Sequence, residues 1–186
     1  MNFRQLVLVT HRWLGLGSSL VLFVLGVTGA FLVRPGLPFN RIAGLLHETF
    51  GFQKLGIGPI GRWIIVIATV SAVLLEAGGI FLWWKRKVLR VRVGQGLRKG
   101  LIDLHHVAGT VGLPLMFLLA LSGLGMRVFN GKEYPAMREV VKAVHTARTF
   151  PMPIQVVYVI GSAGFVVQGV TGIVMWWRPA KRYPGE

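Results

Sequence analysis

Four long apolar stretches constrain this 186-residue chain more than any other feature of its sequence. They lie near residues 6–33, 63–84, 101–128 and 154–177, and each is long enough to cross a hydrocarbon core of about 30 Å as a helix. A helix satisfies its backbone hydrogen bonds within one segment, as a bilayer requires. We therefore predict an all-α integral membrane four-helix bundle with the lipid bilayer as its solvent.

The basic residues gather beside these stretches. The net charge is +15, which in a soluble protein would suggest a nucleic-acid partner, but flanking positions instead set membrane orientation, so we expect no nucleic acid. The segment 85–100 contains no acid, and the tail after residue 177 is also basic. By the positive-inside rule, both termini and this middle loop are predicted to be cytoplasmic. The basic residues concerned are Lys85, Arg86, Lys87, Arg90, Arg92, Arg98, Lys99, Arg178, Lys181 and Arg182.

The chain contains an internal repeat. A shift of 94 residues aligns His11 with His105, Gly15 with Gly109, and Thr28-Gly29 with Ser122-Gly123, while a shift of 93 aligns 79–85 with 172–178. We predict a single transmembrane domain over residues 1–186, built from repeats 1–93 and 94–186. Both halves enter the membrane in the same direction, so their pseudo-twofold axis should run along the membrane normal.

The repeat pairs four of the five histidines. His11 pairs with His105 near the inner surface, and His47 pairs with His145 near the outer surface. There is no cysteine, so metal chemistry must rest on histidine or carboxylate. Two facing imidazoles in each leaflet are what bis-histidine ligation of two b-type haems requires. The sequence therefore predicts four axial ligands to haem iron.

The inner site has further candidates. His106 aligns with Arg12, and the sequence leaves open whether His105 or His106 is the ligand. Gly15 and Gly109, one turn after His11 and His105, could make room for a flat macrocycle. Small residues also mediate close helix packing in lipid, which is the more general explanation for glycines.

Glu76 is an acid inside an otherwise apolar stretch, and the residue that the repeat aligns with it is Gly169. It is a candidate proton relay or quinone contact. The alternative is a neutral carboxyl that hydrogen-bonds to a neighbouring helix.

The outer segments are also basic, with Arg41, Arg62, Arg138, Lys142 and Arg148 near the outer histidines. Haem propionates and many ferric chelates are anionic, so these cations, Arg148 among them, could bind either. The alternative is that they meet only lipid headgroups.

Several motifs occur in an order that resembles the PepSY-associated transmembrane family. The resemblance covers nearly the whole chain and rests on Thr10-His11-Arg12-Trp13, Leu46-His47-Glu48, Gly61-Arg62-Trp63, Trp83-Trp84-Lys85-Arg86, Asp103-Leu104-His105-His106 and Val144-His145-Thr146.

The resemblance implies haem-linked electron transfer in the bacterial inner membrane, as in relatives that reduce ferric siderophores. It also implies His11, His47, His105 and His145 as ligands. Two departures affect substrate recognition. The segment 35–61 is too short for the soluble PepSY domain of longer members, and residues 147–151 lack the usual glycine-containing stretch.

We weigh two functions. The first is a dihaem b-type protein that carries electrons from the cytoplasmic side to an outside acceptor, such as a ferric chelate or siderophore. We expect no nucleotide-binding domain in this chain, so a cytoplasmic reductase or membrane quinol would be the donor. The second is a non-catalytic membrane scaffold or assembly subunit of an iron-uptake or transport system.

Overall fold

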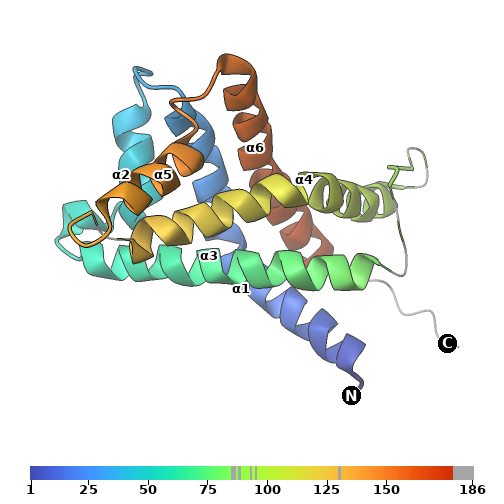
Figure 1. Ribbon diagram of the computed structural model, residues 1–186. Coiled ribbons are helices and arrows are strands. Elements are labelled where there is room, and N and C mark those ends of the chain that lie inside the picture. The colour runs from blue at the N-terminus through green and yellow to red at the C-terminus, as the bar shows by residue number, and fades with distance from the viewer. Residues whose placement is uncertain (85–86, 88, 93, 95, 130, 178–186) are drawn as a thin grey trace, which may run out of the picture.

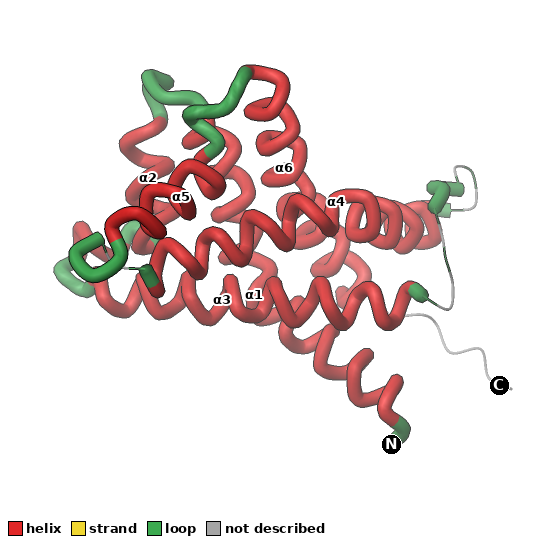
Figure 2. The backbone as a smooth tube through the Cα atoms, viewed as in Figure 1, coloured by secondary structure: helices red, strands yellow, loops and turns green. Residues whose placement is uncertain are grey.

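The computed structural model describes residues 1–84, 87, 89–92, 94, 96–129 and 131–177. The predicted cytoplasmic residues Lys85, Arg86, Arg178, Lys181 and Arg182 lie outside the described part. Within that part the chain is helical and has no strand (Figures 1 and 2). In order, the elements are α1 (Phe3–Val33), α2 (Asn40–Thr49), the 3-10 helix η1 (Phe52–Leu55), α3 (Gly58–Trp83), α4 (Leu97–Val128), α5 (Pro135–Thr146) and α6 (Met152–Trp177).

The four long helices α1, α3, α4 and α6 confirm the predicted membrane architecture. Each is long and apolar enough to cross a bilayer. Large apolar side chains in their central parts point outward, and Leu20, Ile67, Val111 and Ile160 are each more than 60% exposed. Because water would penalise such exposure and lipid would not, the chain is a multi-pass membrane protein.

The long helices extend beyond the predicted apolar stretches. The α3 helix begins at Gly58 rather than near residue 63, with a proline in its first turn, and α4 begins at Leu97 rather than near residue 101. Proline suits the first turn of a helix because the N–H it lacks would have no partner there. Hydropathy marks the part of a helix within the hydrocarbon, while backbone hydrogen bonding continues into the polar region.

The α1 and α6 helices form the closest pair of spans. A Cβ atom at Gly26 would lie 2.6 Å from the backbone oxygen of Ser162, and one at Gly169 would lie 3.1 Å from that of Ser19. The α3 and α4 helices, which lie in front of this pair in Figure 1, contact each other much less than α1 contacts α6. The two interfaces between the halves of the predicted repeat are thus unequal in extent.

Two short helices position the outer histidines. The α2 helix connects α1 to α3, and α5 connects α4 to α6, at the end of the bundle away from the N-terminus (Figure 1). At the end of α2, the Thr49 carbonyl lies so close to Gly61 of α3 that a Cβ atom there would clash with it. Thr49 is itself only 2% exposed. A glycine on α3 therefore sets how closely α2 approaches.

Candidate functional site

The histidine pair that is predicted to lie near the outer surface, called the outer pair below, comes from the two short helices. His47 comes from α2 and His145 from α5, and their ring centroids are 6.0 Å apart with an interplanar angle of 48°. Each ring meets a hydroxyl from a span. The Nδ1 atom of His47 is 2.9 Å from Thr28 Oγ1, and that of His145 is 3.1 Å from Ser122 Oγ. Thr28 and Ser122 are matched by the repeat, so the two contacts are equivalent.

Each of these hydroxyls also contacts a backbone carbonyl of its own helix. Thr28 donates to the Val24 carbonyl at 2.7 Å, and Ser122 donates to the Leu118 carbonyl at 2.7 Å. A hydroxyl has one proton, so while it donates to the carbonyl it can only accept from the imidazole. In that arrangement Nδ1 carries the proton, and the Nε2 lone pair is available to a metal.

Glycines allow the outer rings to lie against the spans. A Cβ atom at Gly29 would be 3.4 Å from Cε1 of His47, and one at Gly123 would be 3.2 Å from Cε1 of His145. The repeat also matches these two glycines. A side chain at either position would occupy space next to the ring, so the site depends on their small size.

Burial keeps the outer histidines neutral. It lowers the pKa of His47 to about 4, with smaller contributions from the nearby charges of His145 and Arg127. Burial is also the main cause that lowers the pKa of His145. Both rings are thus neutral at physiological pH, which is the form that ligates a metal.

The inner pair comes from two spans. The ring centroids of His11 on α1 and His105 on α4 are 6.4 Å apart, with an interplanar angle of 85°. The Nδ1 atom of His105 is 2.8 Å from Thr171 Oγ1 on α6. Thr171 also donates to the Val167 carbonyl at 2.6 Å, so the same arrangement, with the proton on Nδ1 and Nε2 available, fits His105.

His11 differs from the other three ligand candidates. Its buried Nδ1 atom has no side-chain hydroxyl partner among the described residues, and the polar group nearest to the ring is the backbone carbonyl of Leu75. Cβ atoms at Gly78 and Gly79 of α3 would lie 3.6 Å from its Nδ1 and 3.5 Å from its Cε1. The ring of His11 thus faces glycines where the ring of His105 faces a threonine.

The separations within both pairs fit one metal ion between two imidazoles. A histidine nitrogen lies about 2 Å from a metal that it ligates, which places the centres of two opposed rings roughly 6 Å apart. Thr28, the partner of His47, lies some 25 Å along α1 from His11 at 1.5 Å per residue. The two pairs therefore lie at opposite depths of the bundle.

A cavity of about 400 Å³ opens beside the outer pair. His47 and His145 line it together with four cations, Arg127, Arg138, Lys142 and Arg148, and with the acid Glu48. Residues of α1, α3, α4 and α6 complete its wall. The size is within the range of small-molecule and cofactor sites, and the charge is suited to anionic groups.

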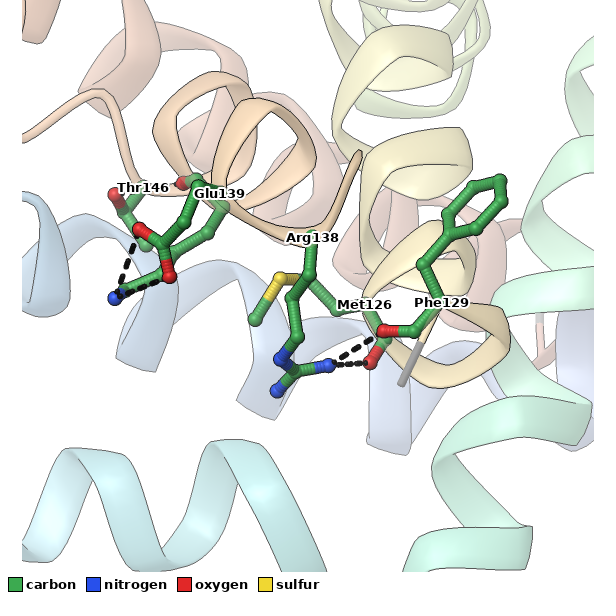
Figure 3. A network of polar contacts seen from close by, with 6 residues as sticks. Met126, Phe129, Arg138, Glu139 and Thr146 are labelled. Atoms are coloured by element: carbon green, nitrogen blue, oxygen red, sulfur yellow. Dashed lines mark hydrogen bonds and ion pairs between the residues drawn. The ribbon is translucent and has the colours of Figure 1, made fainter. Parts of the chain in front are cut away.

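Backbone carbonyls orient the arginines around this cavity. Arg138 donates to the Met126 and Phe129 carbonyls at 2.7 and 3.0 Å, at the end of α4 (Figure 3). Arg127 donates to the Glu48 carbonyl and Arg148 to the Leu32 carbonyl, each at 2.9 Å. A carbonyl is neutral, so these contacts hold the guanidinium groups in place without cancelling their charge. Lys142, by contrast, is 3.4 Å from the Glu139 carboxylate.

The remaining predicted residues have other surroundings. Arg12 is exposed on α1, and the His106 ring lies 6.5 Å from that of His105. A Cβ atom at Gly15 would meet Leu75 at 3.7 Å, and one at Gly109 would meet Gln168 at 3.1 Å. These contacts are with neighbouring helices, as in helix packing. They leave a role of the two glycines in cofactor binding as a prediction.

Glu76 is buried on α3, and neither carboxyl oxygen has a hydrogen-bond partner among the described residues. It lies one turn from Ala72, which lines the outer cavity, and three residues before Gly79, which approaches His11. Glu76 thus lies between the two histidine pairs along the helix.

Sequence reasoning missed three residues near these sites. Thr171 gave no signal because the residue aligned with it is Gly78. Gln168 donates to the His105 carbonyl at 2.8 Å. Asp103 is fully buried two residues before His105 and forms a bidentate ion pair with Arg92 at 2.8 and 2.7 Å. A lone acid beside a basic loop could have suggested this pair.

Comparisons with known proteins give one family and one relative. The family described as the PepSY-associated TM region matches residues 34–135. The uncharacterized protein PA4219 of Pseudomonas aeruginosa is 39% identical over 79 residues, which are 39% of this chain and 20% of that protein. The match thus spans one fifth of the relative's length. No solved structure matches the chain significantly.

Proposed function

This chain belongs to the family of the PepSY-associated TM region, and we propose that it is a dihaem b-type transmembrane electron-transfer protein. In this function electrons move from the cytoplasmic side to an acceptor outside, which we propose is ferric iron in a chelate such as a siderophore. The two histidine pairs carry the proposal. Their ring centroids are 6.4 and 6.0 Å apart, and three of the four rings have a hydroxyl at Nδ1, which would leave Nε2 available.

The residues present fit such a cofactor. His11 and His105 would hold one b-type haem, and His47 and His145 the other. A bound haem supplies one-electron redox chemistry at its iron. The chain supplies neutral imidazoles, a buried setting and, around the outer pair, cations that offset propionate charge or bind an anionic acceptor.

Glu76 is the proposed proton or quinone contact. Its buried carboxyl has no hydrogen-bond partner among the described residues and lies between the two pairs. An ionisable group in such a position is costly and is commonly retained for function. Electrons would come from a cytoplasmic reductase or from membrane quinol.

We propose that the protein lies in the bacterial inner membrane with both termini in the cytoplasm. The support is the basic loop 85–100. A reporter that is active only outside the cytoplasm should work when fused near Lys132 and fail when fused near Gly94. The opposite result would invert the direction of electron flow.

A visible spectrum of the purified full chain tests the function most directly. Protein from haem-sufficient cells should show a sharp Soret band, and reduction should produce the α and β bands of six-coordinate haem at two haems per chain. Colourless protein would overturn the proposal and favour a scaffold or assembly subunit. In that case, haem added to the colourless protein should also fail to produce a bis-histidine spectrum.

A further inference from the structure

Three of the four ligand candidates share one arrangement. The Nδ1 atoms of His47, His145 and His105 lie 2.9, 3.1 and 2.8 Å from a serine or threonine hydroxyl. In each case the hydroxyl donates a hydrogen bond to a backbone carbonyl one turn earlier in its own helix. His11 has no such partner, and the repeat places Gly78 where His105 has Thr171.

We propose that Thr28, Ser122 and Thr171 are positioning residues that fix the tautomer and ring orientation of their histidines. We further propose that Gly78 leaves His11 as the one ligand whose ring is not fixed in this way. The inner pair would then consist of one imidazole with a hydroxyl partner and one without. The proposal rests on the proposed function for the binding of iron, but its statement about tautomers concerns the protein alone.

The physical reason is the second hydrogen bond of a metal-ligating histidine. A partner for Nδ1–H keeps the proton off Nε2, holds the ring plane, and makes the ligating nitrogen more basic. Loss of such a partner typically weakens metal binding about 10- to 100-fold. A more basic ligand stabilises the ferric state, so the hydroxyls should also lower the potential of the haem that they support.

A hydroxyl that donates to a carbonyl within its own helix is common and does not by itself indicate a role in positioning a ligand. Thr110 on α4 does the same, donating to the His106 carbonyl at 2.8 Å. The distinguishing feature of the three proposed residues is the imidazole nitrogen within hydrogen-bond distance. Thr110→Val is therefore the matched control for loss of an intrahelical hydroxyl.

The first experiment removes the hydroxyls from the full chain. Thr171→Val should weaken haem binding about tenfold or more at the inner site, raise the potential of that haem, and leave the outer haem unchanged. Thr28→Val and Ser122→Ala should do the same at the outer site. Thr171→Ser should restore the wild-type values, and Thr110→Val should match wild type.

The second experiment adds the missing hydroxyl. A Cβ atom at Gly78 would be in ordinary contact, 3.6 Å from His11 Nδ1 and 3.5 Å from Val7. Gly78→Ser can therefore present an oxygen to Nδ1, whereas Gly78→Ala adds the carbon alone. Gly78→Ser should lower the potential of the inner haem relative to Gly78→Ala. This test remains decisive if the removal variants fail to fold.

Nitrogen-15 NMR of the haem-free full chain separates this proposal from the proposed function. His47, His105 and His145 should be in the Nδ1–H tautomer, and Thr171→Val should shift His105 towards Nε2–H. A wild-type protein that binds no haem would overturn the proposed function while these tautomers could still be read. Unchanged tautomers in Thr171→Val, or equal potentials in Gly78→Ser and Gly78→Ala, would overturn the proposal.

Discussion

The outer histidines lie on two short helices at one end of the bundle, whereas the inner histidines lie within two of its spans. At the outer pair the repeat is kept in detail, with a hydroxyl and a glycine against each ring. At the inner pair, among the described residues, a hydroxyl meets His105 and none meets His11. The outer cavity is also lined by four cations. The two histidine pairs are thus alike in ring separation while their surroundings differ.

The difference suggests separate tasks. The cation-lined outer cavity is suited to an exchangeable anionic partner, while the inner pair lies between spans, with His11 against α3 and His105 against α6. Since the outer rings depend on how α2 and α5 dock, small changes in packing should affect them more than the inner rings.

Loss of a ligand should divide the haem content of the protein. His11→Ala or His105→Ala should remove about half of the haem and leave the outer haem bound. His47→Ala or His145→Ala should remove the outer haem and leave the inner haem bound, because each haem would need both imidazoles. The outer variants should also lose reduction of an external ferric chelate. Quantitative pyridine haemochrome spectra and a ferric-citrate reduction assay measure both effects.

His106→Ala is the control for the inner pair and should retain nearly all the haem, because the ring opposed to His11 is that of His105. The two-site arrangement is wrong if the outer variants keep full haem and full external reduction. If His106→Ala removes haem and His105→Ala does not, then the ligand on α4 is His106.

Overpacking at Gly61 should damage only the outer site. The Cβ atom in Gly61→Ala would clash with the Thr49 carbonyl, so α2 must move and carry His47 with it. A forced shift in a well-packed contact typically costs about 1–3 kcal/mol. We expect loss of outer haem with the inner spectrum retained, and a lower thermal unfolding midpoint.

Gly44→Ala on α2 is the matched control, since a Cβ atom there meets nothing within 4 Å among the described residues. It should leave both the spectrum and the midpoint unchanged. Equal haem loss at both sites in Gly61→Ala would show that α2 docking supports the whole bundle rather than the outer pair.

Neutralising one cation should have the smallest effect. Arg148→Gln removes a charge that lines the cavity and should raise the KM for ferric citrate several-fold with little change in kcat, since the attraction between opposite charges acts on binding. Salt of about 1 M should produce a similar rise in wild type, because it shortens the screening length to about 3 Å. A salt-independent KM that Arg148→Gln does not alter would restrict this cation to a structural role.

The sequence alone determined the membrane-spanning helices, because twenty or more apolar residues in succession have few other stable arrangements. It also paired the four histidines, which the structure brings together as predicted within each pair. Thr28, Ser122 and their following glycines could be found as well, since the repeat aligns them. These features depend on residue type and spacing along one chain.

The tertiary structure alone decided the rest. Thr171 meets His105 from another helix, and no counterpart in the first repeat marks it. The close α1–α6 pair, the outer cavity and the contact of Thr49 with Gly61 depend on how side chains of distant segments interlock. Hydropathy and repeat spacing describe each helix separately, whereas packing selects which faces meet and how closely they approach.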